Sequence, residues 1–569
     1  MYNYEDLIQA QTKNLGKYLQ IDNDSIFIIP FSQRDYEWGK TEITRLFNDL
    51  TYLYQSSDDE IHMLNFFTFS RDDSNNLRIF DGQQRTVTCL LILASIAQRL
   101  YQQGKEDAAK QIRSDYFVKH DSLRKNSSEK RKLQFDSEED NEYFYRVTNI
   151  KFDPKEELSQ KNVQELKGNC KTFAKNMHII EELIDKFIEN RDKVELTELA
   201  TSITDKTLIV QFIAKKEDIA LNMFESLNNT GKNIDKYYVL KNDMVKSLGE
   251  DNVKRTWNNI DSQLDELNHN EFLVTVATIF AGKTNASNVL KNLYMETDTN
   301  AEGEMKKLLS FLKEASEKFL WICMPNQIGT NESKREKDEY RELTNQISLF
   351  SMKQHRPIVL ALLLQKKNLS EINKVLKTIL DLTVKNFYFD EQKANKIEVK
   401  YANYAKEIFN HNLSVQKLIE KIEKLCISDA QFKNAILNKE IPKNRKISFI
   451  LRKTYNYKYK KGEVEVSNNN DVEHILPRTP KKNSQWLGWF SNEEQRKKYT
   501  YSIGNLTLWS ASDNRSAQNA EFADKKKQYK ESQIEENIKI SEKNEWTINE
   551  INNRSQYMAD EIIRAFRNE

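Results

Sequence analysis

The spacing of hydrophobic and polar residues divides the chain into a mixed N-terminal region, a helical middle and a C-terminal region with two short strands. In the N-terminal region, alternation of hydrophobic and polar residues predicts strands at 25–31, 62–70, 77–80 and 207–214. A spacing close to the helical period predicts N-terminal helices at 42–54, 86–101, 219–227 and 237–248. A polar turn separates the second and third strands, so these two are expected to form a hairpin.

The remainder of the chain is mostly helical in pattern. Residues 251–440 combine helical stripes with polar connections, alternation returns at 471–476 and 502–508, and a helical pattern covers 510–529. We therefore expect a multidomain protein that is predominantly α with small α+β parts, because 569 residues are too many for one core. The expected domains are 1–250 with a helical insertion at about 155–200, a helical linker domain at 251–430, and 431–569.

Composition supports long helices in a globular protein. The chain has only 13 Gly and 7 Pro, the two residue types that most disfavour helices. Its 30% charged and 38% hydrophobic residues suit a folded chain rather than a disordered one. No run of about 18 apolar residues occurs, so no membrane span is expected. The first residues lack the basic and apolar regions of a signal peptide.

The cysteines and the charge distribution narrow the picture further. The four cysteines are scattered without C-x-x-C spacing, which predicts reduced thiols and a cytoplasmic protein. The same spacing excludes a structural zinc site built from two Cys pairs. Residues 441–530 hold 19 Lys and Arg against 9 Asp and Glu, so their net charge of +10 leaves −9 for the remainder. Such a basic surface favours DNA, although lysine runs can also simply solubilise a helix.

The segment Glu473-His474-Ile475-Leu476-Pro477 is the strongest indication of chemistry. Asn505 follows at the second C-terminal strand, and Asn514 lies near the start of the next predicted helix. An acid–His pair, an Asn on the second strand and a polar residue at a helix start make up the HNH nuclease constellation. Phosphodiester hydrolysis needs a base, which a neutral His supplies, and a divalent cation. Oxygen ligands from Glu and Asn suit Mg²⁺ or Mn²⁺.

Each part of this constellation also has a simpler interpretation. A His beside a Glu is often a surface pair, and an Asn before an apolar strand is often a turn residue. The order of strand, long loop, strand and helix favours the nuclease interpretation. Two tryptophans in the loop, Trp486 and Trp489, could stack on bases or anchor the core, and the core interpretation is favoured.

Two polar glycine turns in the N-terminal region could bind a phosphate. The first joins a predicted strand to a helix start in the segment Asp81-Gly82-Gln83-Gln84-Arg85. A helix N-terminus offers backbone N–H groups to an anion, and Arg85 could add a bidentate contact. The second turn contains Asn229 and Gly231 and could reach the same ligand. Both turns could instead serve only as helix caps.

Together these segments resemble the GmrSD-type family of prokaryotic modification-dependent restriction endonucleases, which join an N-terminal ParB/sulfiredoxin-like domain to a C-terminal HNH domain. The N-terminal resemblance rests on residues 29–38, 81–85 and 224–231. The C-terminal resemblance rests on residues 473–477 and 503–508, Asn514, Asn519, Phe522 and Lys526. The helical middle carries no motif of this kind.

The resemblance implies a ParB-like α+β N-terminal domain that binds and hydrolyses a nucleoside triphosphate, which could be GTP, ATP or CTP. Gly82, Gln83, Gln84 and Arg85 would hold its phosphates, with Asn229 and Gly231 nearby and Asp81 assisting with metal or water. It also implies a C-terminal ββα-metal HNH domain embedded in helices. Relatives sense modified DNA, such as glucosylated hydroxymethylcytosine or phosphorothioate linkages, so attack on modified phage DNA is expected.

The resemblance further implies residue roles in the nuclease centre. His474 is the expected general base, Glu473 and Asn514 are the expected metal ligands, and Asn505 is expected to brace the strands and orient His474 by hydrogen bonding. Asn519 is a secondary candidate. One such centre cuts one strand, so nicking is the elementary event, and a double-strand break would need a homodimer or two nicks.

The chain departs from the family pattern at three positions. Asn65 stands where a Gly is frequent, Thr230 where an Arg is frequent, and Glu473 where many relatives have Asp. The first two departures bear on nucleotide identity and hydrolysis. The third bears on metal geometry, because Glu has a longer side chain than Asp.

The residues that sense a modification are expected in the first motif, at Gln33, Arg34, Tyr36 and Trp38. An aromatic and amide cluster suits a flipped base, but the same residues could brace the ParB-like core. The function expected is a nucleotide-regulated DNA nickase of type IV restriction in antiphage defence. The alternatives are a nucleotide-switched DNA-binding protein with a structural HNH fold, and an indiscriminate toxin nuclease.

Overall fold

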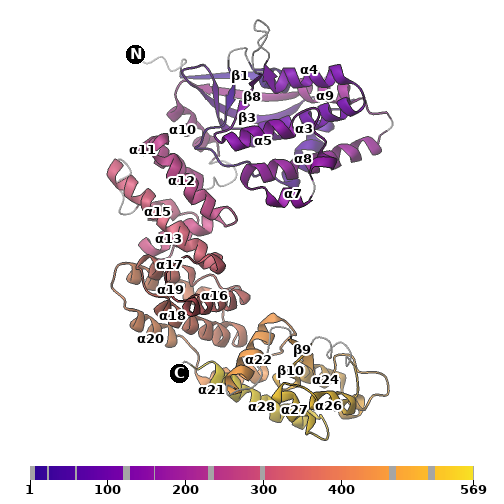
Figure 1. The fold of residues 1–569 in the computed structure, drawn as a ribbon, viewed down its shortest axis with the longest axis vertical. Coiled ribbons are helices and arrows are strands. Elements are labelled where there is room, and N and C mark those ends of the chain that lie inside the picture. The colour runs from indigo at the N-terminus through magenta and orange to yellow at the C-terminus, as the bar shows by residue number, and fades with distance from the viewer. Residues whose placement is uncertain are drawn as a thin grey trace. The chain divides into compact units, whose positions relative to one another are not determined.

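The computed structural model is predominantly helical, with a six-stranded mixed sheet in the N-terminal region (Figure 1). It describes residues 7–21, 25–57, 60–119, 129–158, 160–191, 193–228, 236–294, 301–459, 470–510 and 519–567. The chain forms two compact units, Met1–Asn258 with Thr299–Leu309 and Asn259–Asp298 with Ser310–Glu569. We call them unit 1 and unit 2. The expected boundary at 250 lies near the end of the first segment of unit 1, and the expected boundary at 430 lies inside unit 2.

The sheet of unit 1 has the strand order β1-β8-β3-β4-β2-β7. Its strands are β1 (Ile8–Asn14), β2 (Phe27–Ile28), β3 (His62–Arg71), β4 (Leu77–Asp81), β7 (Leu133–Gln134) and β8 (Thr207–Ala214). β3 and β4 are antiparallel neighbours, so the predicted hairpin is confirmed, and β8 has the predicted bounds. The strand predicted at 25–31 is only the two residues of β2. β1 was not predicted, because most of its side chains are exposed and it has few apolar residues.

Helices of unit 1 pack beside this sheet around the buried helix α3 (Gln83–Gln102), which contacts α4, α8 and α9. The other helices are α1 (Leu15–Gln20), α2 (Lys40–Thr51), α4 (Glu106–Tyr116), α5 (Glu138–Val147), α6 (Pro154–Glu157), α7 (Gln160–Glu165), α8 (Gly168–Glu189), α9 (Leu196–Lys206), α10 (Glu217–Asn228) and α11 (Lys236–Leu248). The next helix, α12 (Glu250–Leu264), begins in unit 1 and ends in unit 2. A small antiparallel pair joins β5 (Val118–Lys119) to β6 (Lys130–Arg131). The four predicted N-terminal helices are confirmed, with bounds that differ by a few residues.

The first part of unit 2 is helical, as the sequence pattern predicts. Its elements are α13 (His269–Ala281), α14 (Val289–Leu293), α15 (Glu302–Cys323), η2 (Pro325–Gln327), α16 (Lys334–Leu349), α17 (Arg356–Leu364), α18 (Leu369–Leu382), η3 (Thr383–Phe389), α19 (Asn395–Phe409), α20 (Val415–Glu423), α21 (Asp429–Asn438) and α22 (Arg445–Lys458). α17 buries an apolar surface all round, whereas α18 and α20 have one polar face. None of the described helices is both long and apolar enough to span a membrane.

The C-terminal part of unit 2 is a strand hairpin packed against helices. β9 (Asn470–His474) pairs antiparallel with β10 (Leu506–Ser510), and His474 lies opposite Leu506. The surrounding elements are α23 (Gln485–Trp489), α24 (Glu493–Thr500), η4 (Ile503–Asn505), α26 (Phe522–Lys530), α27 (Glu535–Ser541) and α28 (Ile548–Ala565). The predicted second strand is thus partly the helical turn η4. Of the helix predicted at 510–529, α26 confirms residues 522–529, whereas Ser510 belongs to β10; residues 511–518 lie outside the described ones.

Four tryptophans and their neighbours form the core around this hairpin. Trp486, Trp509 and Trp546 are buried, and Trp489 packs against the cluster. The indole N–H of Trp486 donates a hydrogen bond to the carbonyl oxygen of Ala520 at 3.0 Å. The core interpretation of Trp486 is therefore confirmed, and this packing holds α26 beside the two strands.

Candidate active site

The end of β9 places His474 in a buried position with an unpaired ring nitrogen. The residue is 6% exposed, and its Nε2 has no hydrogen-bond partner among the described residues. The ring of Tyr501 stands edge-on to the imidazole, with ring centroids 5.8 Å apart. Burial, together with the positive charges of Arg478, Lys443 and Lys525, lowers the pKa of His474 to about 4. The imidazole is therefore neutral at pH 7 and able to accept a proton.

Glu473, the neighbour of His474, is paired with a lysine from α26. It is 5% exposed, and its Oε1 accepts a hydrogen bond from the ammonium of Lys525. Lys525 has no exposed surface, and burial lowers its pKa while Glu473 opposes that change. Burial likewise raises the pKa of Glu473, and the Lys525 ammonium opposes this. The pair links α26, the helix of the predicted ββα arrangement, to β9, its first strand.

Lys525 was missed by the sequence analysis, which singled out its neighbour Lys526. The spacing of Lys525 from its apolar neighbours along the helix could have predicted that it is buried. Phe522, Lys525 and Tyr529 are the buried residues of α26, and they recur at three and four positions as one face of a helix requires. Lys526 is only partly buried.

Asn505 immediately precedes β10, across from the end of β9, and is fully buried. Its Oδ1 accepts hydrogen bonds from the backbone N–H of Leu476 at 2.7 Å and the indole N–H of Trp546 at 3.1 Å. Its Nδ2 donates to the carbonyl oxygens of Leu476 at 3.1 Å and Thr500 at 3.0 Å. These contacts hold the chain just beyond β9. They reach the backbone two residues past His474 and do not include the imidazole.

The remaining nuclease candidates lie on the segment between β10 and α26. Asn514 falls outside the described residues. Asn519 donates a hydrogen bond from its Nδ2 to the Oγ1 of Thr479 at 3.2 Å, so it contacts the loop that follows β9. Within the described parts of the chain, no three His, Cys, Asp or Glu side chains gather as a metal site.

In unit 1, the turn between β4 and α3 has a geometry that only glycine accommodates. Gly82 has φ of +96°, and a Cβ added there would lie 2.1 Å from the ring of Phe67. Asp81 and Arg85 form an ion pair across the turn at 3.1 Å. Arg85 also donates to the carbonyl oxygen of Leu64 at 2.8 Å and lies over the Phe67 ring at 4.5 Å. Its guanidinium is thus held against the protein.

The two glutamines of this turn, Gln83 and Gln84, form hydrogen bonds with the backbone of the motif at 29–38. Gln84 accepts from the N–H groups of Glu37 at 2.9 Å and Trp38 at 3.2 Å, and it donates to the carbonyl oxygen of Asp35 at 2.8 Å. Gln83 donates to the carbonyl oxygen of Arg34 at 2.6 Å. The motifs at 81–85 and 29–38, far apart in sequence, therefore form one structure.

Two buried polar atoms beside these contacts remain unpaired. The Oε1 of Gln83 and the Oγ of Ser32 have no hydrogen-bond partner within the described residues. Both residues are less than one-tenth exposed. Such atoms are costly unless a ligand or water satisfies them.

The four residues expected to sense a modification differ in exposure. Tyr36 is buried, stacks on Phe173 with ring centroids 5.6 Å apart, and shares a hydrogen bond with Thr88 at 2.7 Å. Burial raises the pKa of Tyr36 well above its ordinary range. Gln33 is also buried, Trp38 packs partly buried against the core, and Arg34 is exposed. Asn229 and Gly231, expected near the nucleotide, lie outside the described residues.

Comparison with known families covers both of these regions. Residues 9–245 match the family described as GmrSD restriction endonuclease, N-terminal domain. Residues 426–561 match GmrSD restriction endonucleases, C-terminal domain. The chain belongs to the GmrSD restriction endonuclease family. A search of curated proteins found none that matches it. As a GmrSD-family protein it is a type IV restriction nuclease, an enzyme that hydrolyses DNA.

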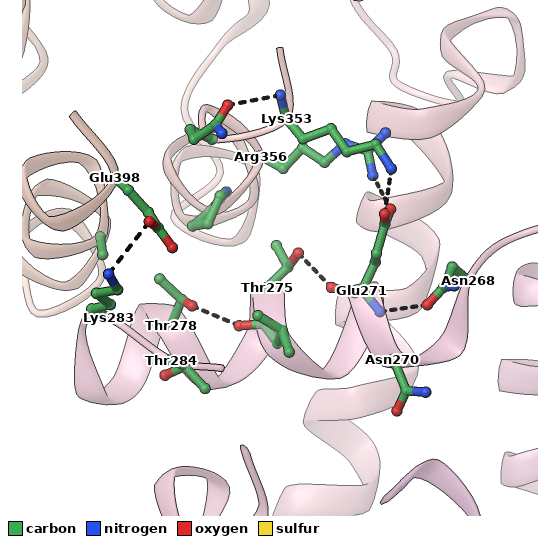
Figure 2. A pocket seen from close by; sticks show the side chains of 14 residues that line it. Asn268, Asn270, Glu271, Thr275, Thr278, Lys283, Thr284, Lys353, Arg356 and Glu398 are labelled. Atoms are coloured by element: carbon green, nitrogen blue, oxygen red, sulfur yellow. Dashed lines mark hydrogen bonds and ion pairs between the residues drawn. The ribbon is translucent and has the colours of Figure 1, made fainter. Parts of the chain in front are cut away.

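The helical middle falls outside both matched segments of this GmrSD protein, and it contains a pocket of about 330 Å³. α13, α19 and the start of α17 form its walls. Figure 2 shows that its charged groups face one another. Glu271 pairs with Lys353 and, at 2.6 Å, with Arg356, while Lys283 pairs with Glu398 at 3.4 Å. The pocket lining includes none of the predicted site residues.

Proposed function

We propose that the chain is a nucleotide-regulated, metal-dependent DNA nickase that acts on modified foreign or phage DNA. The observation that carries this proposal is the buried, unpaired Nε2 of His474, whose pKa of about 4 keeps the imidazole neutral. A neutral imidazole with a free ring nitrogen is what a hydrolytic base requires. Family membership supplies DNA as the substrate.

In this mechanism His474 takes the proton from the attacking water. Glu473 and Asn514 would hold Mg²⁺ or Mn²⁺, which suits their oxygen donors because Mg²⁺ usually takes one or two carboxylates and keeps several waters. When bound, the cation neutralises charge on the scissile phosphate. Asn505 keeps the loop after β9 rigid, so the imidazole is held in place through its backbone.

DNA would reach the site along its basic surface. Arg478 and Lys443 are exposed, and both lie close enough to His474 to lower its pKa. Their charges favour a phosphate group next to the imidazole. Arg478 also lies near Tyr501, 6.0 Å from its ring centroid. Because the Tyr501 ring in turn lies next to the His474 imidazole, the three side chains follow one another along the site.

The nucleotide, GTP, ATP or CTP, would bind in the ParB-like N-terminal domain at the turn Asp81-Gly82-Gln83-Gln84-Arg85. Two unpaired atoms support a ligand there, because the Oε1 of Gln83 can accept from a nucleotide hydroxyl or amine and the Oγ of Ser32 can donate to a phosphate oxygen. Gln83 and Gln84 also hold the backbone at 34–38. A nucleotide that moves either glutamine would therefore move the loop that carries Arg34 and Trp38. This coupling offers a route from nucleotide binding to DNA sensing.

The proposal is tested by nicking of supercoiled plasmid with and without glucosylated hydroxymethylcytosine, each with and without a nucleoside triphosphate. Nicking that depends on divalent metal and on His474 supports the nickase. Preference for the modified plasmid and dependence on nucleotide support regulated restriction. Equal cutting of both plasmids would favour an indiscriminate toxin nuclease instead. DNA binding without nicking on any modified or phosphorothioate substrate would favour a switched DNA-binding protein.

A further inference from the structure

Lys525 is the one residue of α26 whose charge is placed in the protein interior. It has no exposed surface, although lysine is among the residue types least often fully buried. Burying an ammonium is costly unless each of its protons finds an acceptor. Its neighbours on the helix with the same side chain, Lys527 and Lys530, are exposed.

The three protons of this ammonium have three acceptors on consecutive residues. Nζ donates to the carboxylate of Glu473, to the carbonyl oxygen of His474 at 2.9 Å and to the carbonyl oxygen of Ile475 at 3.1 Å. All the donors of Lys525 are thus used on the end of β9. The contacts hold both the side chain of Glu473 and the main chain on which the His474 imidazole is carried.

Asn505 also forms hydrogen bonds with this segment, to the backbone of the two residues that follow His474. Its backbone carbonyl accepts from the N–H of Ile475 at 3.0 Å, and its side chain bonds both backbone groups of Leu476. Residues 473–476 are therefore held from two sides, by the Asn505 amide at the end of η4 and by the Lys525 ammonium from α26. Of the two, Lys525 alone touches the carboxylate.

We propose that Lys525 is a positioning residue of the nuclease centre, which orients the Glu473 carboxylate for the divalent cation and holds the backbone of His474 in register with it. This inference rests on the proposed function. Groups that hydrogen-bond a metal ligand commonly change metal affinity or activity by about 10- to 100-fold when removed. A free Glu473 carboxylate would sample several rotamers, so the cation would have to order it on binding.

Two effects of opposite sign compete when the ammonium is removed. Loss of a positive charge beside the carboxylate favours a cation, whereas loss of orientation disfavours it. Because Lys525 also holds two backbone carbonyls of the same strand end, we expect the loss of orientation to dominate. Lys525→Met should then bind Mn²⁺ about 10-fold or more weakly than the wild type.

The test is isothermal titration with Mn²⁺ on the full chain, at a temperature where each variant is folded by circular dichroism. Glu473→Gln defines the signal of the site, and Lys530→Met, on the same helix, is the matched control. Lys525→Gln keeps two of the three donors and serves if Lys525→Met does not fold. Weaker Mn²⁺ binding in the Lys525 variants and unchanged binding in Lys530→Met is the expected result.

Equal or tighter Mn²⁺ binding by folded Lys525 variants would overturn the inference, because a purely stabilising lysine would lower the melting temperature alone. If the wild type binds Mn²⁺ and nicks DNA through His474 in that case, the proposed function stands and only the role of Lys525 fails. If the wild type shows no binding that Glu473→Gln removes, the metal assignment fails, and the inference fails with it.

Discussion

The nuclease hairpin and the N-terminal glycine turn both carry motifs of the GmrSD family, but they use their polar side chains differently. In the hairpin, Lys525 and Asn505 brace the backbone, and the Nε2 of His474 has no hydrogen-bond partner among the described residues. In the turn, Gln84 and Arg85 direct their polar atoms to backbone groups or to Asp81. Among the buried side-chain atoms of this turn, the Oε1 of Gln83 has no hydrogen-bond partner within the described residues.

This difference teaches that a motif residue can be required for two separate reasons. His474 keeps a ring nitrogen without a hydrogen-bond partner, as the proposed base requires, whereas Gln84 links two motifs by hydrogen bonds. Loss of the first should remove activity from a folded protein, and loss of the second should remove local structure. The following predictions separate these effects, beginning with the largest.

The largest effects are expected from one glycine in each region. Gly82→Ala adds a Cβ 2.1 Å from the Phe67 ring at a left-handed φ, and Gly504→Ala adds one 2.2 Å from the carbonyl oxygen of Ile551. We expect each change to cost about 3 kcal/mol or more in its own region, because the clash requires a backbone shift. Hydrogen exchange would locate the loss.

Two further glycines serve as matched controls for these variants. Gly104 has φ of +77° and Gly488 has an ordinary φ, and neither has an atom within 4 Å of an added Cβ. Gly104→Ala should cost only about 1 kcal/mol for its backbone, and Gly488→Ala less. If Gly82→Ala and Gly504→Ala resembled these controls, the close contacts would not exist as described.

A comparable loss of stability is expected when either of the two bracing amides is removed. Asn505→Ala leaves four hydrogen-bonding groups without their partner, and Gln84→Ala leaves three. Each unsatisfied buried group costs about 1–3 kcal/mol. Chemical denaturation should show a larger loss of stability for Asn505→Ala. Equal stability of the wild type and either variant would contradict the bracing role.

Lowering the pH should reduce the folding stability of unit 2, because two of its histidines are buried. Burial lowers the pKa of His474 to about 4 and that of His355 to about 3, whereas the ordinary value is 6.5. The unfolded chain therefore binds the proton first, so stability is lost as pH falls below about 6.5, by up to about 1.4 kcal/mol per pH unit for each histidine. The raised pKa of Glu473 opposes this loss.

Denaturation of the wild type and His355→Gln at pH 7 and pH 5 checks this expectation. The variant should lose less stability between the two pH values, and the exposed His178 in unit 1 provides a control through His178→Gln. Nicking should stay level between about pH 6 and 8, because His474 remains neutral there. A fall in nicking with an apparent pKa near 6.5 would show that His474 is not held as described.

The smallest effect is expected from the basic surface. Arg478→Ala should weaken DNA binding a few-fold and lower the slope of log affinity against log salt by about 1, as one lost phosphate contact does. Lys417→Ala, an exposed lysine of the helical middle, is the matched control. Fluorescence anisotropy across salt concentrations measures both slopes, and identical slopes for the two variants would remove Arg478 from the DNA path.

Much of the strand and helix layout could be predicted from sequence, because periodicity reports which face is buried. β8 has its predicted bounds, although the alternating Leu208, Val210 and Phe212 lie on its less buried face. β1 was missed because its side chains are mostly exposed and its partner β8 is distant in sequence. Such pairing depends on tertiary structure, which local patterns do not report.

The site was predicted in part. The strand bearing Glu473 and His474 was predicted at 471–476, and β9 covers residues 470–474. The burial of Lys525 was missed because a lysine is expected at the surface, and only its spacing from Phe522 and Tyr529 indicates otherwise. The contact between Gln84 and the 35–38 backbone joins residues nearly fifty positions apart, which no local pattern contains.

The most direct test of the central claim is metal-dependent nicking of supercoiled DNA by the wild type and His474→Ala, with both proteins shown to be folded by circular dichroism. The structure predicts that the wild type nicks with Mg²⁺ or Mn²⁺ and that His474→Ala is slower by about 100-fold or more. Nicking by His474→Ala at the wild-type rate would contradict the assignment of His474 as the base.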